Sequence, residues 1–454
     1  MISPFFHRVI YYICAFSFIF NFAYSSSVAA APKIIRDEEI ERILKVYASP
    51  IFDQAGLDRH TVNLILVESP ELNAFVAGGM NIFVYTGLIL ETEDPGEVIG
   101  VLAHETSHIS SGHLIRTKLA MEHASKQSIL TTLLGIAAAL GTGSAEAGTA
   151  ITLGGQNIVG RQFLAHSRAN EASADQGAAN FLKKAKLSPI GLHSFMEKLS
   201  SEELLPTSQQ SEYVRTHPLT LNRVKFLARM VEESRYAEKP LPAEWLTLHQ
   251  RMQAKLIGYL YPDRALRNQK SDFASQYAKA IAYYRKNKKD FALTILNQLI
   301  KQEPYNPYLY ELKGQILLEN GLIEDAIAPN KRAISLLPDA SLFRVTYAHN
   351  LLELKNAPTD KTLEALRQLK YALKKEKTSP RVHRLLATAY GRLDNKGYAR
   401  LHLAEEALLQ NHPSRAIRQA LYAQEDIEKG TSGWYQLQDL MQSAKKRLVQ
   451  KGKR

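Results

Sequence analysis

Two histidines and a glutamate lie close together in the first quarter of the 454-residue chain, in the run His104-Glu105-Thr106-Ser107-His108. On a helix, residues i and i+4 share a face, so both imidazoles can bind a single zinc ion. Glu105, between them, can act as general base toward a water molecule that zinc makes acidic. The run therefore predicts a zinc site, with one Zn²⁺ per chain, that can hydrolyse a peptide bond.

A catalytic zinc site needs a third protein ligand and leaves one position for water. The best candidate is Glu171 in Glu171-Ala-Ser-Ala-Asp175, where two acidic residues one helical turn apart lie among small residues that permit close packing. Asp175 would then orient a ligand histidine or assist proton transfer. An exposed acidic pair on a helix surface is the alternative, and it would be favoured if this segment stood alone.

A well-capped helix is expected to carry the two histidines. Asp94 can cap it, Pro95 suits the first helical position, and Glu97 completes the spacing of a capping box. The helix is expected to continue to about Gly112. The chemistry therefore lies on a regular element rather than on a loop.

The segments before this helix read as one helix and two strands. Asp37 to Ala55 is amphipathic, while the branched residues of Thr61 to Val67 and of Asn81 to Thr86 predict short strands. A turn at Gly78-Gly79 precedes the second strand. After the histidine helix, the apolar stretch 125–160 predicts a buried helical hairpin, with a mobile lid or membrane-surface element as the alternative. A long helix is expected over roughly residues 161–184.

The first thirty residues have the layout of a secretory signal peptide. His7 and Arg8 precede the apolar run Val9 to Phe22, and small residues follow up to Ala30. We expect cleavage near Ala30; an uncleaved membrane anchor is the alternative, and either one exports the body of the chain. Cys14, the one cysteine, lies in this run, so disulfides and cysteine catalysis are excluded and a metal must use His and carboxylate ligands.

A 34-residue period appears beyond about residue 270. Small and apolar residues recur at this interval, which is the pattern of tetratricopeptide repeats. The first two copies share these positions: Ala280, Tyr283, Ala292, Leu296, Leu299 and Pro304, then Gly314, Leu317, Ala326, Asn330, Ala333 and Pro338. Weaker copies follow, with Ala348, Leu351, Ala365 and Ala372 in the third and Ala387, Tyr390 and Ala399 in the fourth. A degenerate fifth copy or cap is expected after them, and a helical bundle without repeats is the alternative.

The net charge of +12 comes from the C-terminal half alone. From Leu266 onward there are 33 Lys and Arg residues against 19 Asp and Glu, in a chain that totals 57 against 45. The basic residues are mostly spread along helices, which indicates a solvated face rather than a nucleic-acid site. The alternative is that these basic residues bind an acidic partner or an anionic membrane surface, and the sequence therefore also allows peripheral membrane contact.

These motifs together resemble the Ste24-type zinc metallopeptidases. The resemblance is carried by His104-Glu-x-x-His108, then Glu171-x-x-x-Asp175, preceded by Asn73-Ala-Phe and Gly78-Gly79. Within that family, the signal peptide, the lack of interior membrane spans and the repeat tail resemble the periplasmic β-barrel assembly-enhancing protease group. The resemblance covers nearly the whole chain after the signal.

The resemblance assigns roles to individual residues. It makes Glu105 the catalytic base, His104, His108 and Glu171 the zinc ligands, and Asp175 the supporting acid. It also implies that Asn73, Ala74 and Arg223 belong to the substrate-binding region, Asn73 and Ala74 through an edge strand that pairs with extended substrate backbone.

Three further residues match the family pattern downstream of the motif. His217, in Arg215-Thr216-His217-Pro218, corresponds to a histidine that either caps the zinc in a latent state or stabilises the oxyanion in an active one. A loop histidine without a role is the alternative. His113 and Arg116 also match, and we expect His113 to pack or orient rather than to bind the metal.

The sequence thus predicts an α+β zincin-like metallopeptidase domain, mostly helical with a small sheet, followed by an all-α tetratricopeptide solenoid. The expected boundaries are a signal peptide at 1–30, the peptidase at 31–265 and the repeats at 270–454. By resemblance, the protein cleaves misfolded or stalled outer-membrane β-barrel proteins in the periplasm, and its repeats contact the assembly machinery.

Two other functions are alternatives to this one. The first is a chaperone or scaffold that acts through its repeats, with a latent zinc site; the intact Glu105 argues against it, because a purely structural site needs no base. The second is an integral-membrane prenyl-protein protease, which the lack of long apolar spans after residue 30 disfavours.

Overall fold

Short runs of branched residues form a four-stranded sheet in the computed structural model, which describes residues 33–122, 125, 167–206, 209–355 and 357–452. The strand order is β1-β2-β4-β3, with β2 and β4 parallel and both outer pairs antiparallel. The strands are β1 (Lys33–Ile35), β2 (Asn63–Glu68), β3 (Ala74–Ala77) and β4 (Asn81–Tyr85). β2 and β4 correspond to the two predicted strands, whereas β1 was not foreseen.

The turn between β3 and β4 needs glycine. Gly78 and Gly79 have φ values of 59° and 99°, a region that residues with a side chain rarely adopt. The turn reverses the chain so that β3 pairs with β4 and lies at one edge of the sheet. One side of β3 is therefore without a neighbouring strand within the described residues.

The helix α4 (Pro95–Ser110) begins as the sequence predicts, with one difference. The Asp94 side chain accepts a hydrogen bond from the Gly96 amide, and Pro95 occupies the first turn. Glu97 does not complete the capping box: its carboxylate instead forms an ion pair with Lys198 at 3.0 Å. The nearby lysine provides a stronger partner for this buried carboxylate than a backbone amide does.

Around the sheet and α4, apolar side chains from both sequence ends of the N-terminal domain form one core. Close packing depends on glycine where α4 meets α7 (Ile190–Leu199): a Cβ on Gly100 would lie 2.6 Å from the Leu192 backbone nitrogen. The other helical elements are α2 (Glu38–Gln54), α3 (Thr86–Glu91), η1 (Ser200–Leu204), α8 (Glu212–Thr216), α9 (Leu221–Glu232), α10 (Ala243–Leu260) and α11 (Pro262–Arg267). Residues 113–122 and 167–185 are also helical.

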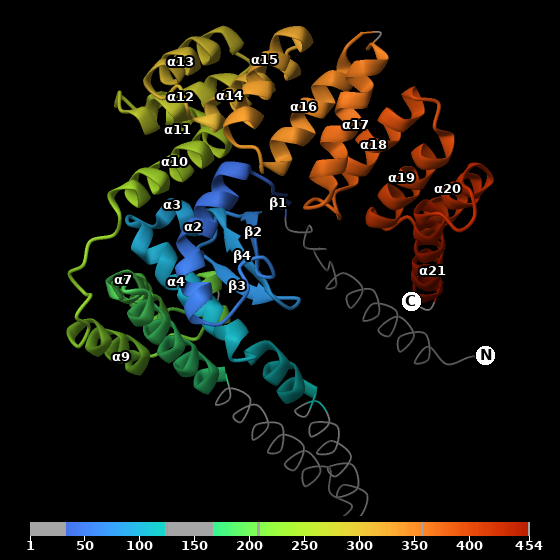
Figure 1. Cartoon of the computed structure of the whole chain (residues 1–454). Coiled ribbons are helices and arrows are strands. Elements are labelled where there is room, and N and C mark those ends of the chain that lie inside the picture. The colour runs from blue at the N-terminus through green and yellow to red at the C-terminus, as the bar shows by residue number, and fades with distance from the viewer. Residues whose placement is uncertain (1–32, 123–124, 126–166, 207–208, 356, 453–454) are drawn as a thin grey trace, which may run out of the picture.

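The C-terminal part of the chain is an array of antiparallel helix pairs, which confirms the predicted repeat fold (Figure 1). In the second pair, Gly314 lets Asn330 approach so closely that a Cβ there would lie 2.1 Å from Asn330 Oδ1. The first three pairs are α12 (Phe273–Arg285) with α13 (Lys289–Gln302), α14 (Pro307–Glu319) with α15 (Ile323–Leu336), and α16 (Ser341–Glu353) with α17 (Thr359–Leu373). They are followed by α18 (Pro380–Arg392) with α19 (Lys396–Leu409), and α20 (Pro413–Asp426) with α21 (Ser432–Gly452).

Hydrogen bonds and ion pairs join the array to the N-terminal domain. The Tyr277 hydroxyl of α12 donates to Glu39 in α2 at 2.9 Å, and the same carboxylate lies 3.2 Å from the buried ammonium of Lys255 in α10. Farther along, Arg36 donates to Glu376 at 2.6 and 3.0 Å. The array is thus held at its first repeat and again at its third.

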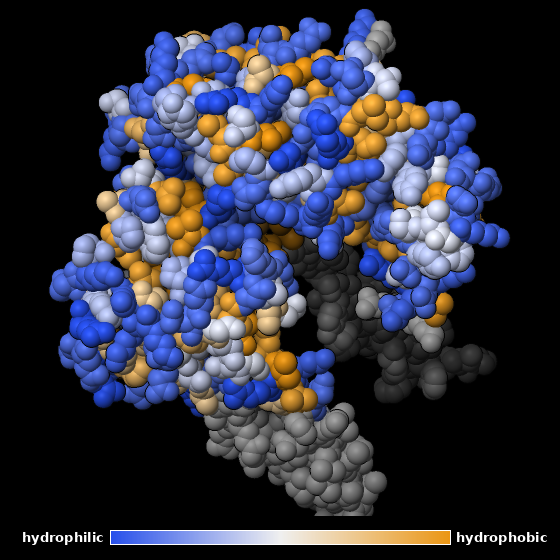
Figure 2. Space-filling view, viewed as in Figure 1, coloured by the Kyte–Doolittle hydropathy of each residue, from blue (hydrophilic) through white to orange (hydrophobic). Residues whose placement is uncertain are grey.

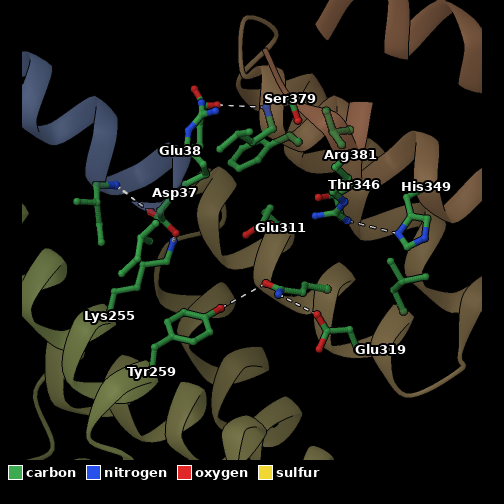
Figure 3. A pocket seen from close by; sticks show the side chains of 18 of the residues that line it. Asp37, Glu38, Lys255, Tyr259, Glu311, Glu319, Thr346, His349, Ser379 and Arg381 are labelled. Carbon is green, nitrogen blue, oxygen red and sulfur yellow. Dashed lines mark hydrogen bonds and ion pairs between the residues drawn. The ribbon is translucent and has the colours of Figure 1, made fainter. Parts of the chain in front are cut away.

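A cavity of about 840 Å³ lies between the two domains (Figure 3). Its walls come from β1, the start of α2, the end of α10 and the first helices of the second, third and fourth pairs. Tyr259 donates to Gln315 across it, and burial raises the pKa of Glu311 to about 7. On the face seen in Figure 2, the array surface is mostly hydrophilic with separate apolar patches, which suits the solvated-face interpretation of its basic residues.

Two sequence predictions fall outside the described residues. The signal peptide at 1–30 is one, and most of the apolar stretch 125–160 is the other. The helix expected over residues 161–184 is described from residue 167 and ends at residue 185. None of the described helices is long and apolar enough to cross a membrane.

Candidate metal centre

Two crossing helices bring the predicted zinc ligands together. On α4, His104 and His108 are one turn apart, and their Nε2 atoms lie 3.1 Å from each other. The helix at 167–185 can approach α4 because Gly177 has no side chain: a Cβ there would lie 2.0 Å from Ser107 Oγ. This approach places Glu171 Oε2 3.3 Å from His104 Nε2 and Oε1 3.5 Å from His108 Nε2.

These separations suit one zinc ion. Ligands about 2.1 Å from a tetrahedral zinc ion are about 3.4 Å from one another, and the three observed distances between nitrogen and oxygen atoms lie close to that value. His104 and Glu171 are buried, and His108 has only 11% of its side chain exposed. Ligand atoms of His104, His108, Glu171 and His217 all lie within 4.8 Å of one another, the one such group found in the described residues.

Asp175 fixes the orientation of His104. Its Oδ1 lies 3.0 Å from His104 Nδ1, so a proton on Nδ1 leaves the Nε2 lone pair free toward the other ligands. Asp175 is itself held by Arg223, whose Nε and Nη2 donate to the carboxylate at 2.6 and 2.9 Å. The site therefore has a second layer of polar contacts behind the ligands.

Arg223, which the resemblance places in the substrate-binding region, contacts two carboxylates of the site. Its Nη1 lies 3.2 Å from Glu171 Oε2 and donates to the Pro218 carbonyl at 2.9 Å, while the other two nitrogens bind Asp175. With 4% exposure, the guanidinium is buried among these partners. Arg223 is placed to neutralise and position the two carboxylates.

The electrostatics of the site favour a cation. Burial alone would lower the pKa of His104, but its hydrogen bonds to Asp175 and Glu171 raise that pKa to about 9. Despite burial, which would raise it, His217 and His104 hold the pKa of Glu171 well below its usual range. Carboxylates that stabilise a positive imidazole stabilise a bound metal ion at the same place.

Glu105 has the environment of a general base. It is 0% exposed; His217 Nε2 lies 3.5 Å from its Oε1, and neither oxygen has a hydrogen bond of good geometry among the described residues. Burial raises its pKa, and His217 and His104 are the main groups that oppose the rise. A buried carboxylate that is so weakly paired is costly, so the site suits a group that Glu105 can bind, such as a water molecule beside a metal.

His217 lies against the ligands rather than out on a loop. It follows α8 directly, is 6% exposed, and has Nδ1 3.2 Å from Glu171 Oε2 and Nε2 3.5 Å from Glu105 Oε1. Its ring stacks on Tyr213 with the centroids 4.6 Å apart. His113 contacts the other ligand histidine, with 3.0 Å between its Nδ1 and that of His108, as expected for an orienting residue.

Tyr213 is the residue that sequence reasoning missed. It is buried beside His217, one helical turn earlier in the chain. The i, i+4 spacing of Tyr213 and His217 was visible in the sequence. Nothing in a five-residue helix, however, distinguished this tyrosine from an ordinary core aromatic.

The edge strand predicted near the site is present. Asn73 is fully buried, and its carbonyl accepts a hydrogen bond from the Tyr85 amide at 3.0 Å. Ala74 begins β3, the outer strand of the sheet. β3 packs against α4, and the Val76 backbone of this strand opposes the rise in the Glu105 pKa that burial causes.

A helix with His-Glu-x-x-His, a glutamate that a second helix brings beside both histidines, and a small sheet form the arrangement of a zincin-like metallopeptidase domain. Residues 35–231, less than half of the chain, match peptidase family M48, and this match supports a metallopeptidase.

Two relatives align with more of the chain than the family model does. The chain is 25% identical over 321 residues to the β-barrel assembly-enhancing protease of Escherichia coli, an alignment that covers 69% of this chain and 65% of the relative. It is 25% identical over 433 residues to a putative β-barrel assembly-enhancing protease of Vibrio cholerae, covering 91% of this chain and 85% of the relative. Among solved structures, MamA matches 39% of this chain and 98% of its own at 16% identity, with a TM-score of 0.29, too low to define a shared fold.

Proposed function

We propose that this protein is a periplasmic zinc metalloendopeptidase that cleaves internal peptide bonds of misfolded or stalled envelope proteins, among them outer-membrane β-barrel proteins. The observation that carries the proposal is the convergence of His104, His108 and Glu171 in one buried group beside the fully buried Glu105. The named relatives support the link to β-barrel assembly, and their likeness extends into the repeats. A signal peptide would direct export and be removed near Ala30, leaving the mature protein in the periplasm.

His104, His108 and Glu171 would hold the zinc ion, which supplies a polarised water as nucleophile when bound. Glu105 accepts the proton of the attacking water and delivers it to the leaving nitrogen. Asp175 keeps the Nε2 atom of His104 unprotonated and directed at the site. The buried position of these groups strengthens each interaction during the reaction.

Substrate in extended form would pair with the open side of β3. This strand lies at the sheet edge and beside Glu105. Main-chain hydrogen bonds to β3 do not depend on side chains, so they suit a protease of broad specificity. Asn73 and Ala74 would set the start of this strand.

His217 would act as a fourth ligand that holds the resting enzyme latent. Its place inside the ligand group supports this role, because an imidazole there takes the position that the water needs. Stabilisation of the oxyanion is the alternative role. The two predict opposite effects of removing the side chain.

The repeats would bind protein partners of the outer-membrane assembly machinery. Repeat arrays present extended surfaces of this kind. Contact with an anionic membrane surface through the basic array is a further proposal, and nucleic acid is not expected as a partner.

Digestion of casein and of a misfolded β-barrel protein by the purified mature protein tests the proposed activity. Cleavage should stop with a chelator, return with added zinc, and fall by about 100-fold or more in Glu105→Gln, with zinc still bound. Glu171→Ala should lose both zinc and activity, because two histidines hold the metal poorly.

Glu97→Gln is the matched control, since this glutamate lies on the same helix but forms an ion pair with Lys198 far from the ligands. It should cleave at the normal rate. Retained cleavage in Glu105→Gln would disprove the assignment of the base. Stoichiometric zinc in Glu171→Ala would mean that another residue is the third ligand.

A further inference from the structure

Tyr213 is a buried tyrosine whose hydroxyl has no partner. Its side chain is 1% exposed, and Oη forms no hydrogen bond with any described residue. Buried hydroxyls nearly always find a partner, and leaving one unpaired costs folding free energy. Such an exception at the edge of a catalytic centre calls for a functional reason.

The ring of Tyr213 is held on two sides, so the direction of its hydroxyl is fixed. It stacks on His217 at 4.6 Å with an interplanar angle of 28°, and it meets Phe195 edge-on at 5.1 Å and 88°. Tyr213 and His217 are also joined through the backbone, because the His217 amide donates to the Tyr213 carbonyl at 2.7 Å. The hydroxyl is therefore positioned before any substrate arrives.

Tyr213 is linked to the proposed base through His217. Its ring stacks on that histidine, whose Nε2 atom lies 3.5 Å from Glu105 Oε1. A tyrosine hydroxyl can donate a hydrogen bond. A donor without a partner thus belongs to a side chain that contacts the group around Glu105.

We propose that the Tyr213 hydroxyl donates a hydrogen bond to the carbonyl oxygen of the scissile peptide bond as that oxygen becomes negatively charged. Attack of water on the carbonyl carbon moves the C=O π electrons onto oxygen, while Glu105 takes the proton from the water. The carbonyl then re-forms as the C–N bond breaks, and Glu105 gives its proton to the departing nitrogen. Tyr213 keeps its own proton throughout.

This inference rests on the proposed peptidase function and gives Tyr213 a role separate from that of His217. A hydrogen-bond donor to the oxyanion affects turnover more than it affects substrate binding. Its hydrogen bond becomes stronger as the carbonyl oxygen gains negative charge in the transition state. Removal of the hydroxyl should therefore lower kcat and leave KM nearly unchanged. Because the hydroxyl has no partner in the folded protein, its removal should not lower the melting temperature.

Tyr213→Phe in the full-length mature protein tests both statements. We expect kcat on casein to fall by about 10- to 100-fold, KM to stay within about twofold, and zinc stoichiometry to be unchanged. The melting temperature of the zinc-free protein should be equal to wild type or higher. Tyr47→Phe is the matched control, since Tyr47 is equally buried but its hydroxyl donates to the Trp245 carbonyl at 2.8 Å.

The control should show the opposite pattern, with a lower melting temperature and normal kcat. Wild-type turnover in Tyr213→Phe, with wild-type protein that cleaves in a zinc-dependent way, would overturn this inference and leave the peptidase function intact. A fall in melting temperature equal to that of Tyr47→Phe would also overturn it, because the hydroxyl would then be structural. Absence of any zinc-dependent cleavage by wild type would refute both proposals.

Discussion

Replacing Arg223 by methionine tests whether this guanidinium holds the carboxylates of Asp175 and Glu171 in place. Arg223 is 4% exposed and donates to both oxygens of Asp175, at 2.6 and 2.9 Å, and its Nη1 lies 3.2 Å from Glu171. Methionine fills a similar volume without charge. The variant therefore leaves two buried carboxylates without their shared cation.

The size of the effect follows from this burial. Removing one partner of a buried ion pair costs about 3–5 kcal/mol, and in a domain of about 200 residues each kcal/mol shifts Tm by about 2–4 °C. The zinc-free Arg223→Met protein should thus melt roughly 6–20 °C below wild type. Its zinc affinity should fall by about 10- to 100-fold, because Asp175 no longer holds His104 in place.

Thermal melting of zinc-free protein and zinc competition against a chromophoric chelator measure the two effects. Arg59→Met is the control, because Arg59 forms the same kind of pair with Asp53 on the surface, with side chains 53% and 40% exposed. Exposed pairs contribute little to stability. If Arg223→Met melts together with Arg59→Met and binds zinc as wild type does, the guanidinium does not support the site and our interpretation is wrong.

Three other changes test separate parts of the structure. His217→Ala should raise basal cleavage of an unfolded substrate if His217 is a latent fourth ligand, and should lower turnover by about 100-fold if it stabilises the oxyanion; unchanged activity would contradict both roles. Gly314→Val should lower the melting temperature of the repeats, measured by circular dichroism, because its Cβ would collide with Asn330 at 2.1 Å. Glu376→Gln should lower Tm at pH 7 but not well below pH 4.5. Burial raises the pKa of Glu376, but the hydrogen bond to Arg36 outweighs burial and lowers that pKa from 4.5. The stability that this bond provides is therefore present above pH 4.5 and is lost on acidification. An equal loss of Tm at both pH values would contradict this.

The histidine helix and the repeats could be predicted because their signals are local. A cap at Asp94, two histidines four residues apart and a 34-residue period each follow from the spacing of neighbouring residues. The same holds for the glycine turn after β3. These features need no knowledge of the rest of the fold.

The contacts that complete the site are long-range and could not be derived in this way. Arg223 is 48 residues from Asp175 in the chain, and only the crossing of two helices brings them together. Glu97 does not complete the capping box because it pairs with Lys198, which is 101 residues away in the chain. β1 is three residues long and depends on pairing with β2, so its own sequence carried little strand signal.

The bond between Arg36 and Glu376 joins residues 340 positions apart, which orders events in time. An exported polypeptide appears N-terminus first, so Arg36 would emerge long before its partner. Until the third helix pair is made, Arg36 has no Glu376 to bind. A chain cut short before Glu376 would keep every residue of the metal centre and still lack this bond. The N-terminal segment and the array are thus joined at this point only once the third helix pair is in place.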